Sequence, residues 1–185
     1  MNIILASNSP RRLELLNSLN GLDITVLPSN IDESGLEKLE PSDLAATLAF
    51  KKAKVVFDKN PDSVVLGADT IVVVNGEILG KPKNEIEAKQ FFKKLCGTTH
   101  EVITGVAVIS KNNIKINHAI TLVTFKEYNE ELVNNYIKNN NPYDKAGGCG
   151  IQDKDLQELV EKVEGDLNNV VGLPLGLVEE MIKSM

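Results

Sequence analysis

The sequence predicts a mixed α/β fold in which a twisted mixed sheet is flanked by helices. One observation is that strand-like and helix-like periodicities alternate along the chain in no regular order. The other is Asn75-Gly76 between two apolar runs, a strong hairpin signal that brings antiparallel pairing into the sheet. The length of 185 residues suits one domain, residues 1–185, or one domain pinched into two lobes.

The N-terminal part predicts a buried strand followed by a helix. Residues 3–6 are apolar and form the strand. Ser9 can cap the helix that follows, and Pro10 suits its first position. Residues 28–40 are polar and predict a loop, and residues 41–57 predict a second helix with one apolar stripe.

The central part predicts two pairs of strands separated by a helix. The strands are residues 63–74, 77–80, 101–110 and 114–126. The helix begins at Asn84, which has Glu87 three residues later as in a capping box, and Gly97 stops it.

The C-terminal part predicts two more helices around a glycine-rich loop. Residues 129–139 form the first helix, which ends before Pro142. Residues 143–153 form the loop and lead into a short strand, and residues 174–183 form the terminal helix.

Composition excludes several classes of protein. Hydrophobic residues make up 42% and charged residues 25%, as in an ordinary globular domain. The net charge of −6 disfavours a nucleic-acid polymer or an anionic membrane as partner. The longest apolar stretch, residues 64–74, is broken by Asp69 and is too short to span a membrane. Cys96 and Cys149 fit neither a disulfide framework nor a metal site, so we expect a cytoplasmic protein with two free thiols.

Two arginines in the first turn of a helix are the first departure from local rules. Arg11 and Arg12 follow Ser7-Asn8-Ser9-Pro10, where the helix dipole is already positive. An anion docked there would make the placement favourable, because hydroxyls, backbone N–H groups and guanidinium groups converge. The alternatives are a phosphate site and a solvated surface pair.

Lys52 and Asp69 are the second and third departures. Lys52 falls on the apolar arc of its helix, where it either snorkels past the core, the commoner outcome, or serves a pocket. Asp69 lies in an otherwise uncharged run, so its carboxylate needs a cation, a metal or a place in a cleft. Gly67 beside it allows a bulge.

The fourth departure is the segment from Asp144 to Gln152, which has three glycines in four positions. Glycines allow close approach of the backbone to a ligand, and a plain flexible loop is the alternative. Gly80-Lys81-Pro82-Lys83 is a similar, weaker signal. His100 and His118 lack metal-ligand spacing and are expected to be structural.

Taken together, these segments resemble the Maf family of nucleoside triphosphate pyrophosphatases. The matching segments are Leu5-Ala6-Ser7-Asn8-Ser9-Pro10-Arg11-Arg12, Gly67-Ala68-Asp69-Thr70-Ile71-Val72, Gly80-Lys81-Pro82-Lys83, Thr104-Gly105-Val106, Asp144-Lys145-Ala146-Gly147-Gly148, Gly150-Ile151-Gln152 and Asn169-Val170-Val171-Gly172-Leu173-Pro174-Leu175. They run in family order, so the resemblance covers essentially the whole chain. Cys149 departs from it, since many relatives carry an aromatic residue there, and so does Cys96, where serine is usual.

The resemblance implies an elongated, two-lobed fold with a central cleft, related to inosine triphosphatases. It implies hydrolysis of a nucleoside triphosphate to the monophosphate and pyrophosphate, with Mg²⁺ or Mn²⁺ as cofactor. Asp69 would be the catalytic base that accepts a proton from the attacking water, or would hold the metal that activates it, and the implied metal ligands are Glu33 and Asp69. The implied substrate-binding residues are Ser7, Arg11, Arg12, Lys52, Thr70, Lys81 and Gln152.

The same resemblance implies dTTP and UTP as substrates. The family's specificity positions carry Arg12, Thr70 and Gln152, whereas the subgroup that prefers 7-methyl-GTP carries an acidic residue in place of the glutamine. The amide of Gln152 offers a donor and an acceptor, which suits the edge of thymine or uracil.

Three alternatives to this function are weighed. They are a 7-methyl-GTP pyrophosphatase, an inosine-type housecleaning enzyme and a non-catalytic nucleotide sensor that regulates septum formation. A sensor should have lost Asp69, Lys81 or the arginines, and none is lost. The sequence leaves a homodimer open.

Overall fold

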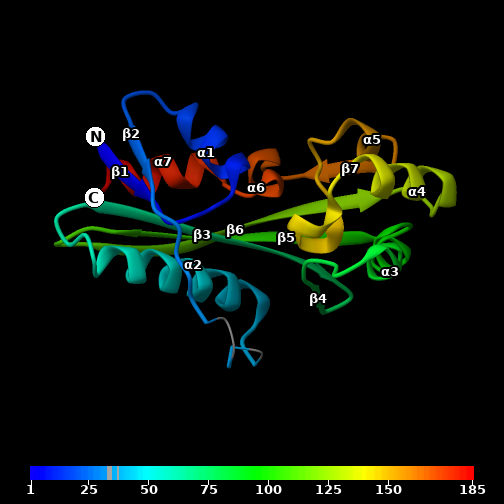
Figure 1. The fold of residues 1–185 in the computed structure, drawn as a ribbon, viewed down its shortest axis with the longest axis horizontal. Helices are drawn as coiled ribbons and strands as arrows, with labels where there is room; N and C mark the ends of the chain where they lie inside the picture. Colours follow the sequence, from blue (N-terminus) through cyan, green and yellow to red (C-terminus); the bar gives the residue numbers. More distant parts are fainter. Residues whose placement is uncertain (33–34, 37) are drawn as a thin grey trace. The chain divides into compact units, whose positions relative to one another are not determined.

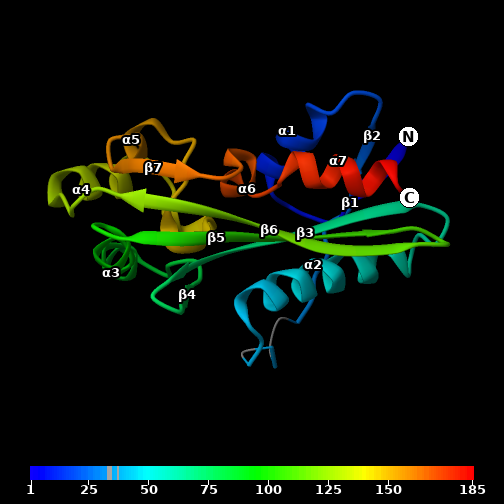
Figure 2. The ribbon, with the colours of Figure 1, turned by 180° about the vertical axis from the view of Figure 1, so that it is seen from behind.

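The computed structural model describes residues 1–32, 35–36 and 38–185, and Figures 1 and 2 show its ribbon from two sides. The predicted metal ligand Glu33 lies outside the described residues. The strands are β1 (Asn2–Leu5), β2 (Asp23–Val26), β3 (Val64–Val74), β4 (Glu77–Leu79), β5 (Thr99–Ile109), β6 (Ile114–Phe125) and β7 (Val160–Glu164). The α-helices are α1 (Pro10–Asn17), α2 (Pro41–Phe57), α3 (Glu85–Leu95), α4 (Glu130–Asn139), α5 (Lys154–Gln157), α6 (Leu167–Val171) and α7 (Leu175–Lys183).

The strands of the described chain form one mixed sheet in the order β2-β1-β3-β5-β6-β7, and β4 pairs with β3. β1 is parallel to β2 and to β3, whereas the β3–β4 and β6–β7 pairs are antiparallel. Asn75 and Gly76 between β3 and β4 have φ values of 50° and 78°, as a type I′ hairpin turn requires. The predicted α/β fold with a mixed sheet flanked by helices is therefore confirmed.

The chain divides into two compact units. Unit 1 consists of Met1–Thr70, Thr104–Ala119 and Gly172–Met185, and unit 2 consists of Ile71–Ile103 and Ile120–Val171. The long strands β3, β5 and β6 each contribute residues to both units. The predicted central cleft and elongated outline stay predictions.

In unit 1, helices cover both faces of the sheet. Ile3 and Leu5 of β1 pack into the core shared with α1 and α7, whereas Ile4 packs into the core shared with α2. Figures 1 and 2 show α2 on one side of the strands and α1 with α7 on the other. Alternate residues of a strand point to opposite faces, which explains this division.

Two glycines let α2 approach the sheet closely. A Cβ atom placed on Gly67 of β3 would lie 2.3 Å from the carbonyl oxygen of Ala49 in α2. A Cβ atom on Gly105 of β5 would lie 2.1 Å from the carbonyl oxygen of Ala45. The structure thus gives Gly67 a different reason from the expected bulge, because only glycine leaves room for the helix backbone there.

Unit 2 has its own apolar core, formed by α3, α4 and the strand residues of this unit. The ring of Phe92 lies 6.5 Å from that of Phe125 and 5.4 Å from that of Tyr136, centroid to centroid. His100 is buried with its ring 4.8 Å from Phe125, and burial lowers its pKa to about 4. Among the described residues, no helix combines the length and apolar character that crossing a membrane requires.

Candidate active site

The turn between β1 and α1 builds the first part of the site. The Ser9 side chain accepts a hydrogen bond from the backbone N–H of Arg12, so Ser9 is the predicted N-cap, and Pro10 occupies the first turn. The Ser7 hydroxyl accepts the N–H of Ser9 at 3.2 Å, and the residue Ser7 is only 7% exposed. Strand, buried serine and helix N-terminus thus meet as the sequence predicts. Arg11 lies on the same first turn and is partly exposed.

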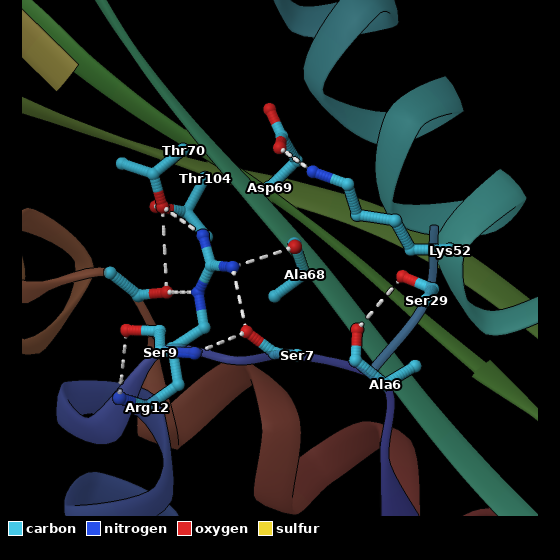
Figure 3. Close-up of polar contacts among 11 residues, drawn as sticks. Ala6, Ser7, Ser9, Arg12, Ser29, Lys52, Ala68, Asp69, Thr70 and Thr104 are labelled. Carbon is cyan, nitrogen blue, oxygen red and sulfur yellow. Dashed lines mark hydrogen bonds and ion pairs between the residues drawn. The ribbon is translucent and has the colours of Figure 1, made fainter. Parts of the chain in front are cut away.

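The Arg12 guanidinium connects three segments of unit 1, as Figure 3 shows. It donates to Ser7 Oγ at 3.2 Å, to the Ala68 carbonyl oxygen at 2.9 Å and to Thr70 Oγ1 at 2.9 Å. Its Nε also donates to the Gly172 carbonyl oxygen at 2.8 Å. Burial lowers the pKa of Arg12, and the nearby Asp69 carboxylate opposes this shift. Arg12 therefore holds the site together, and its predicted contact with substrate stays a prediction.

Thr70 lies at the centre of this network. Its hydroxyl is 2.9 Å from that of Thr104, which is fully buried on β5, and 3.4 Å from the Gly172 carbonyl oxygen. Two of the three predicted specificity residues, Arg12 and Thr70, are therefore in direct contact. The structure adds Thr104 and Gly172 to the site. Both residues occur in the segments that resemble the Maf family, but the local sequence pattern did not indicate a functional role for either of them.

Lys52 and Asp69 form an ion pair in unit 1, with Nζ 2.5 Å from Oδ1. The Lys52 side chain is 16% exposed and that of Asp69 is 13% exposed. The cation that Asp69 was predicted to need is therefore Lys52. The Lys52 ammonium ends on Asp69 of β3, and the helix α2 that carries Lys52 is seated closely on Gly67 of the same strand.

The described residues supply part of the predicted metal site. The 1–32, 35–36 and 38–185 ranges contain no cluster of three or more histidine, cysteine, aspartate or glutamate side chains that could hold an ion. Asp69 is a hard oxygen donor of the type that Mg²⁺ and Mn²⁺ prefer. A magnesium ion is commonly held by one or two carboxylates together with substrate phosphates, so Asp69 fits the expected cofactor.

In unit 2, the glycine-rich loop packs against the segment that follows β4. The N–H of Gly147 donates to the Gly80 carbonyl oxygen at 2.9 Å, and a Cβ atom on Gly148 would lie 3.1 Å from Pro82 Cγ. The loop includes the 3₁₀ turns Pro142–Asp144 and Ala146–Gly148. Lys81 and Gln152 are both exposed on this unit.

The two cysteines are free, as expected. Burial raises the pKa of Cys96 to about 11 and that of Cys149 to about 12. The raised pKa values favour the protonated thiols at neutral pH, and both cysteines pack with the core of unit 2.

Comparison with known proteins gives consistent results. A family model described as Maf-like protein matches residues 2–185. A protein of Bacillus cereus (strain ZK / E33L) named dTTP/UTP pyrophosphatase is 47% identical over 180 residues, which covers 97% of this chain and 93% of the relative. A protein of Bacillus anthracis (strain CDC 684 / NRRL 3495) with the same name is 46% identical over the same shares.

Among solved structures, the Staphylococcus aureus Ham1 protein is similar in fold. Its TM-score is 0.61 at 13% sequence identity, and the match covers 100% of this chain and 99% of the other. At this identity the likeness shows the fold alone.

Proposed function

The chain belongs to the Maf-like protein family, and we propose that it is a hydrolase that cleaves dTTP and UTP to the nucleoside monophosphate and pyrophosphate. The observation that carries the proposal is the ion pair between Lys52 and Asp69, at 2.5 Å. Asp69 lies on β3, the strand that also anchors Arg12 through Ala68 and Thr70. This arrangement puts a carboxylate that can accept a proton among cations that can bind phosphate. The names of the 46–47% identical relatives support the choice of substrates.

We assign phosphate binding to the N-terminus of α1. A helix N-terminus presents unpaired backbone N–H groups and the positive end of the dipole. Ser7 lies beside it with its hydroxyl turned toward Arg12, and Arg11 adds a second guanidinium on the same turn. These groups would hold the triphosphate and stabilise the negative charge that spreads over its oxygens in the transition state.

Asp69 would act as the general base. A water oxygen forms the new bond to the α-phosphorus, the bond to the oxygen bridging to the β-phosphorus breaks, and pyrophosphate leaves with that oxygen. The proton of the attacking water passes to the Asp69 carboxylate. Lys52 holds the carboxylate in one orientation and offsets its charge while it lies mostly out of water.

A divalent cation, Mg²⁺ or Mn²⁺, belongs to the proposal. Asp69 would bind it together with Glu33, and when bound it would neutralise charge on the substrate phosphates. Lys81 would add a cation from unit 2.

Base recognition is assigned to Gln152, with Thr70 and Arg12 as the other specificity positions. A buried carboxylate facing a carbonyl of uracil would set acceptor against acceptor at a cost of about 1–3 kcal/mol. The amide of Gln152 avoids this cost. Thymine and uracil differ by one methyl group, so dTTP and UTP should be turned over similarly.

We infer one pyrophosphatase domain over residues 1–185, working in the cytoplasm on free nucleotides, with neither nucleic-acid polymers nor membranes as partners. The link to septum formation that the family resemblance implies stays a prediction, as does a homodimer.

The test is a panel of nucleoside triphosphates hydrolysed by the pure protein with Mg²⁺, with pyrophosphate and orthophosphate measured separately. We expect kcat/KM for dTTP and UTP to exceed that for GTP, ATP and 7-methyl-GTP roughly tenfold to a hundredfold, as a polar mismatch predicts. A preference for 7-methyl-GTP would contradict the proposed substrates.

A further inference from the structure

A hydrogen-bonded turn carries Gln152 on unit 2. The turn consists of residues 150–153 and is closed by a hydrogen bond from the Asp153 N–H to the Gly150 carbonyl oxygen at 2.9 Å. Ile151 is 8% exposed and belongs to the apolar core, whereas Gln152 is exposed. The buried isoleucine and the closed turn therefore direct the Gln152 side chain away from the core.

The hydroxyl of Tyr136 joins both ends of this turn. Tyr136 lies on α4 and is fully buried. Its hydroxyl donates to Asp153 Oδ2 at 2.8 Å and accepts the N–H of Gly150 at 2.9 Å. A tyrosine hydroxyl has one proton to donate and lone pairs to accept, so both functions are used on the same turn. Burial and the hydrogen bond to Asp153 raise the pKa of Tyr136, which keeps this proton in place.

The residues around the Tyr136 hydroxyl hold its two hydrogen bonds, which form a bridge across the turn, in one geometry. Lys145 is 8% exposed, and its Nζ lies 3.6 Å from Asp153 Oδ2 and 3.1 Å from Asp144 Oδ1. A Cβ atom on Gly150 would lie 2.6 Å from Asp153 Oδ2 and 2.7 Å from Lys145 Cε, so a side chain at that end of the turn would displace these two groups. The Phe92 ring packs edge-on against the Tyr136 ring, with 68° between the two ring planes. Buried, satisfied networks of this kind specify one conformation.

We propose that Tyr136 is a positioning residue for base recognition, which holds the Gly150–Asp153 turn so that Gln152 meets the pyrimidine edge. Tyr136 itself does not touch the substrate. The inference rests on the proposed function, in which Gln152 reads the base.

The test is Tyr136→Phe, which keeps the ring and removes the bridge. We expect the ratio of kcat/KM for dTTP to that for GTP to fall roughly three- to tenfold, the change that loss of one net hydrogen bond produces. The fall should come from a higher KM for dTTP, with kcat little changed. Gln152→Ala should lower the same ratio, and adding Tyr136→Phe to Gln152→Ala should lower it no further.

The matched control is Thr121→Val, which also removes a buried hydroxyl from unit 2. The Thr121 hydroxyl donates to the Asp166 carbonyl oxygen and accepts from Asn169 Nδ2, and neither partner belongs to the turn. It should lower the Tm as Tyr136→Phe does and leave the ratio unchanged. If Tyr136→Phe does not fold, Asp153→Ala removes the acceptor of the same bridge and should give the same fall in the ratio.

The experiment distinguishes failure of the proposed function from failure of the inference about Tyr136. A wild-type protein that does not hydrolyse dTTP and UTP overturns the proposed function, and the inference with it. A wild-type protein that prefers them, together with a folded bridge variant that keeps the wild-type ratio or lowers it further in the Gln152→Ala background, overturns the inference alone.

Discussion

The Asp69 carboxylate lies 2.5 Å from the Lys52 ammonium, and both side chains are mostly out of water. Asp69→Asn keeps the shape of the side chain and an oxygen that can accept from Lys52, but an amide cannot take a proton from water. We expect the variant to fold and kcat for dTTP to fall roughly 10²- to 10⁴-fold, the usual contribution of a general base. A folded Asp69→Asn protein with about half the wild-type kcat would remove Asp69 from the mechanism.

Lys52→Met should destabilise the protein, because it leaves the Asp69 carboxylate partly buried without this cation. A loss of about 1–3 kcal/mol in the free energy of unfolding is expected, below the value for a fully buried pair. Lys54→Met is the matched control, since Lys54 also lies 2.5 Å from a carboxylate, that of Asp58, but both are exposed. Lys54→Met should lower the free energy of unfolding, measured with urea, by about 0.5 kcal/mol or less. Equal losses for the two variants would refute a special role for the Lys52–Asp69 pair.

Single residues show what local patterns can and cannot predict. The helical spacing was enough to place Lys52 inward, and the uncharged run was enough to predict that Asp69 needs a partner. Neither pattern says that the two meet, because that depends on the seating of α2 on β3. Glu33 came from the family resemblance alone and lies outside the described residues.

At the scale of elements, α2 is placed by the glycines beneath it. In Gly67→Ala the new Cβ would lie 2.3 Å from the Ala49 carbonyl oxygen and 2.8 Å from the Ala53 backbone nitrogen. The helix must move, and Lys52 must move with it. We expect a loss of about 1–3 kcal/mol in stability, as for an overpacked core, and a lower kcat for dTTP.

The control for this change is Gly176→Ala on α7. No described atom lies within 4 Å of its added Cβ. Alanine is the better helix former, so stability should stay equal or rise by up to about 1 kcal/mol. If Gly67→Ala behaves like Gly176→Ala in thermal unfolding and in activity, the close approach of α2 does not position the site.

The sequence predicted the long elements well because each has a local signal. α2 has the predicted bounds, and Ser9 and Asn84 cap the helices that they were expected to cap. The four-residue strand β2 was missed, because what defines it is its pairing with β1, a strand from which helix α1 separates it in the sequence. The helices α5 and α6 were also missed, because a helix of four or five residues is too short to show the helical spacing of apolar residues.

At the scale of the whole molecule, the network around Arg12 depends on segments far apart in the chain. Arg12 on α1 reaches Ala68 on β3 and Gly172 just before α7. Local patterns left an anion site and a solvated surface pair open at Arg12, and only the fold shows that its guanidinium is used within unit 1. Lys81 and Gln152 belong to unit 2, and their joint action with these residues stays a prediction.

In the proposed reaction, water attacks the α-phosphorus of dTTP. The most direct measurement is hydrolysis of dTTP with Mg²⁺ in ¹⁸O-labelled water, with each product analysed by mass spectrometry. We predict one labelled oxygen in dTMP and unlabelled pyrophosphate as the inorganic product, because the bond from the α-phosphorus to the bridging oxygen breaks. Labelled orthophosphate with dTDP as the nucleotide product would mean that water attacks the γ-phosphorus and that the proposed reaction is wrong.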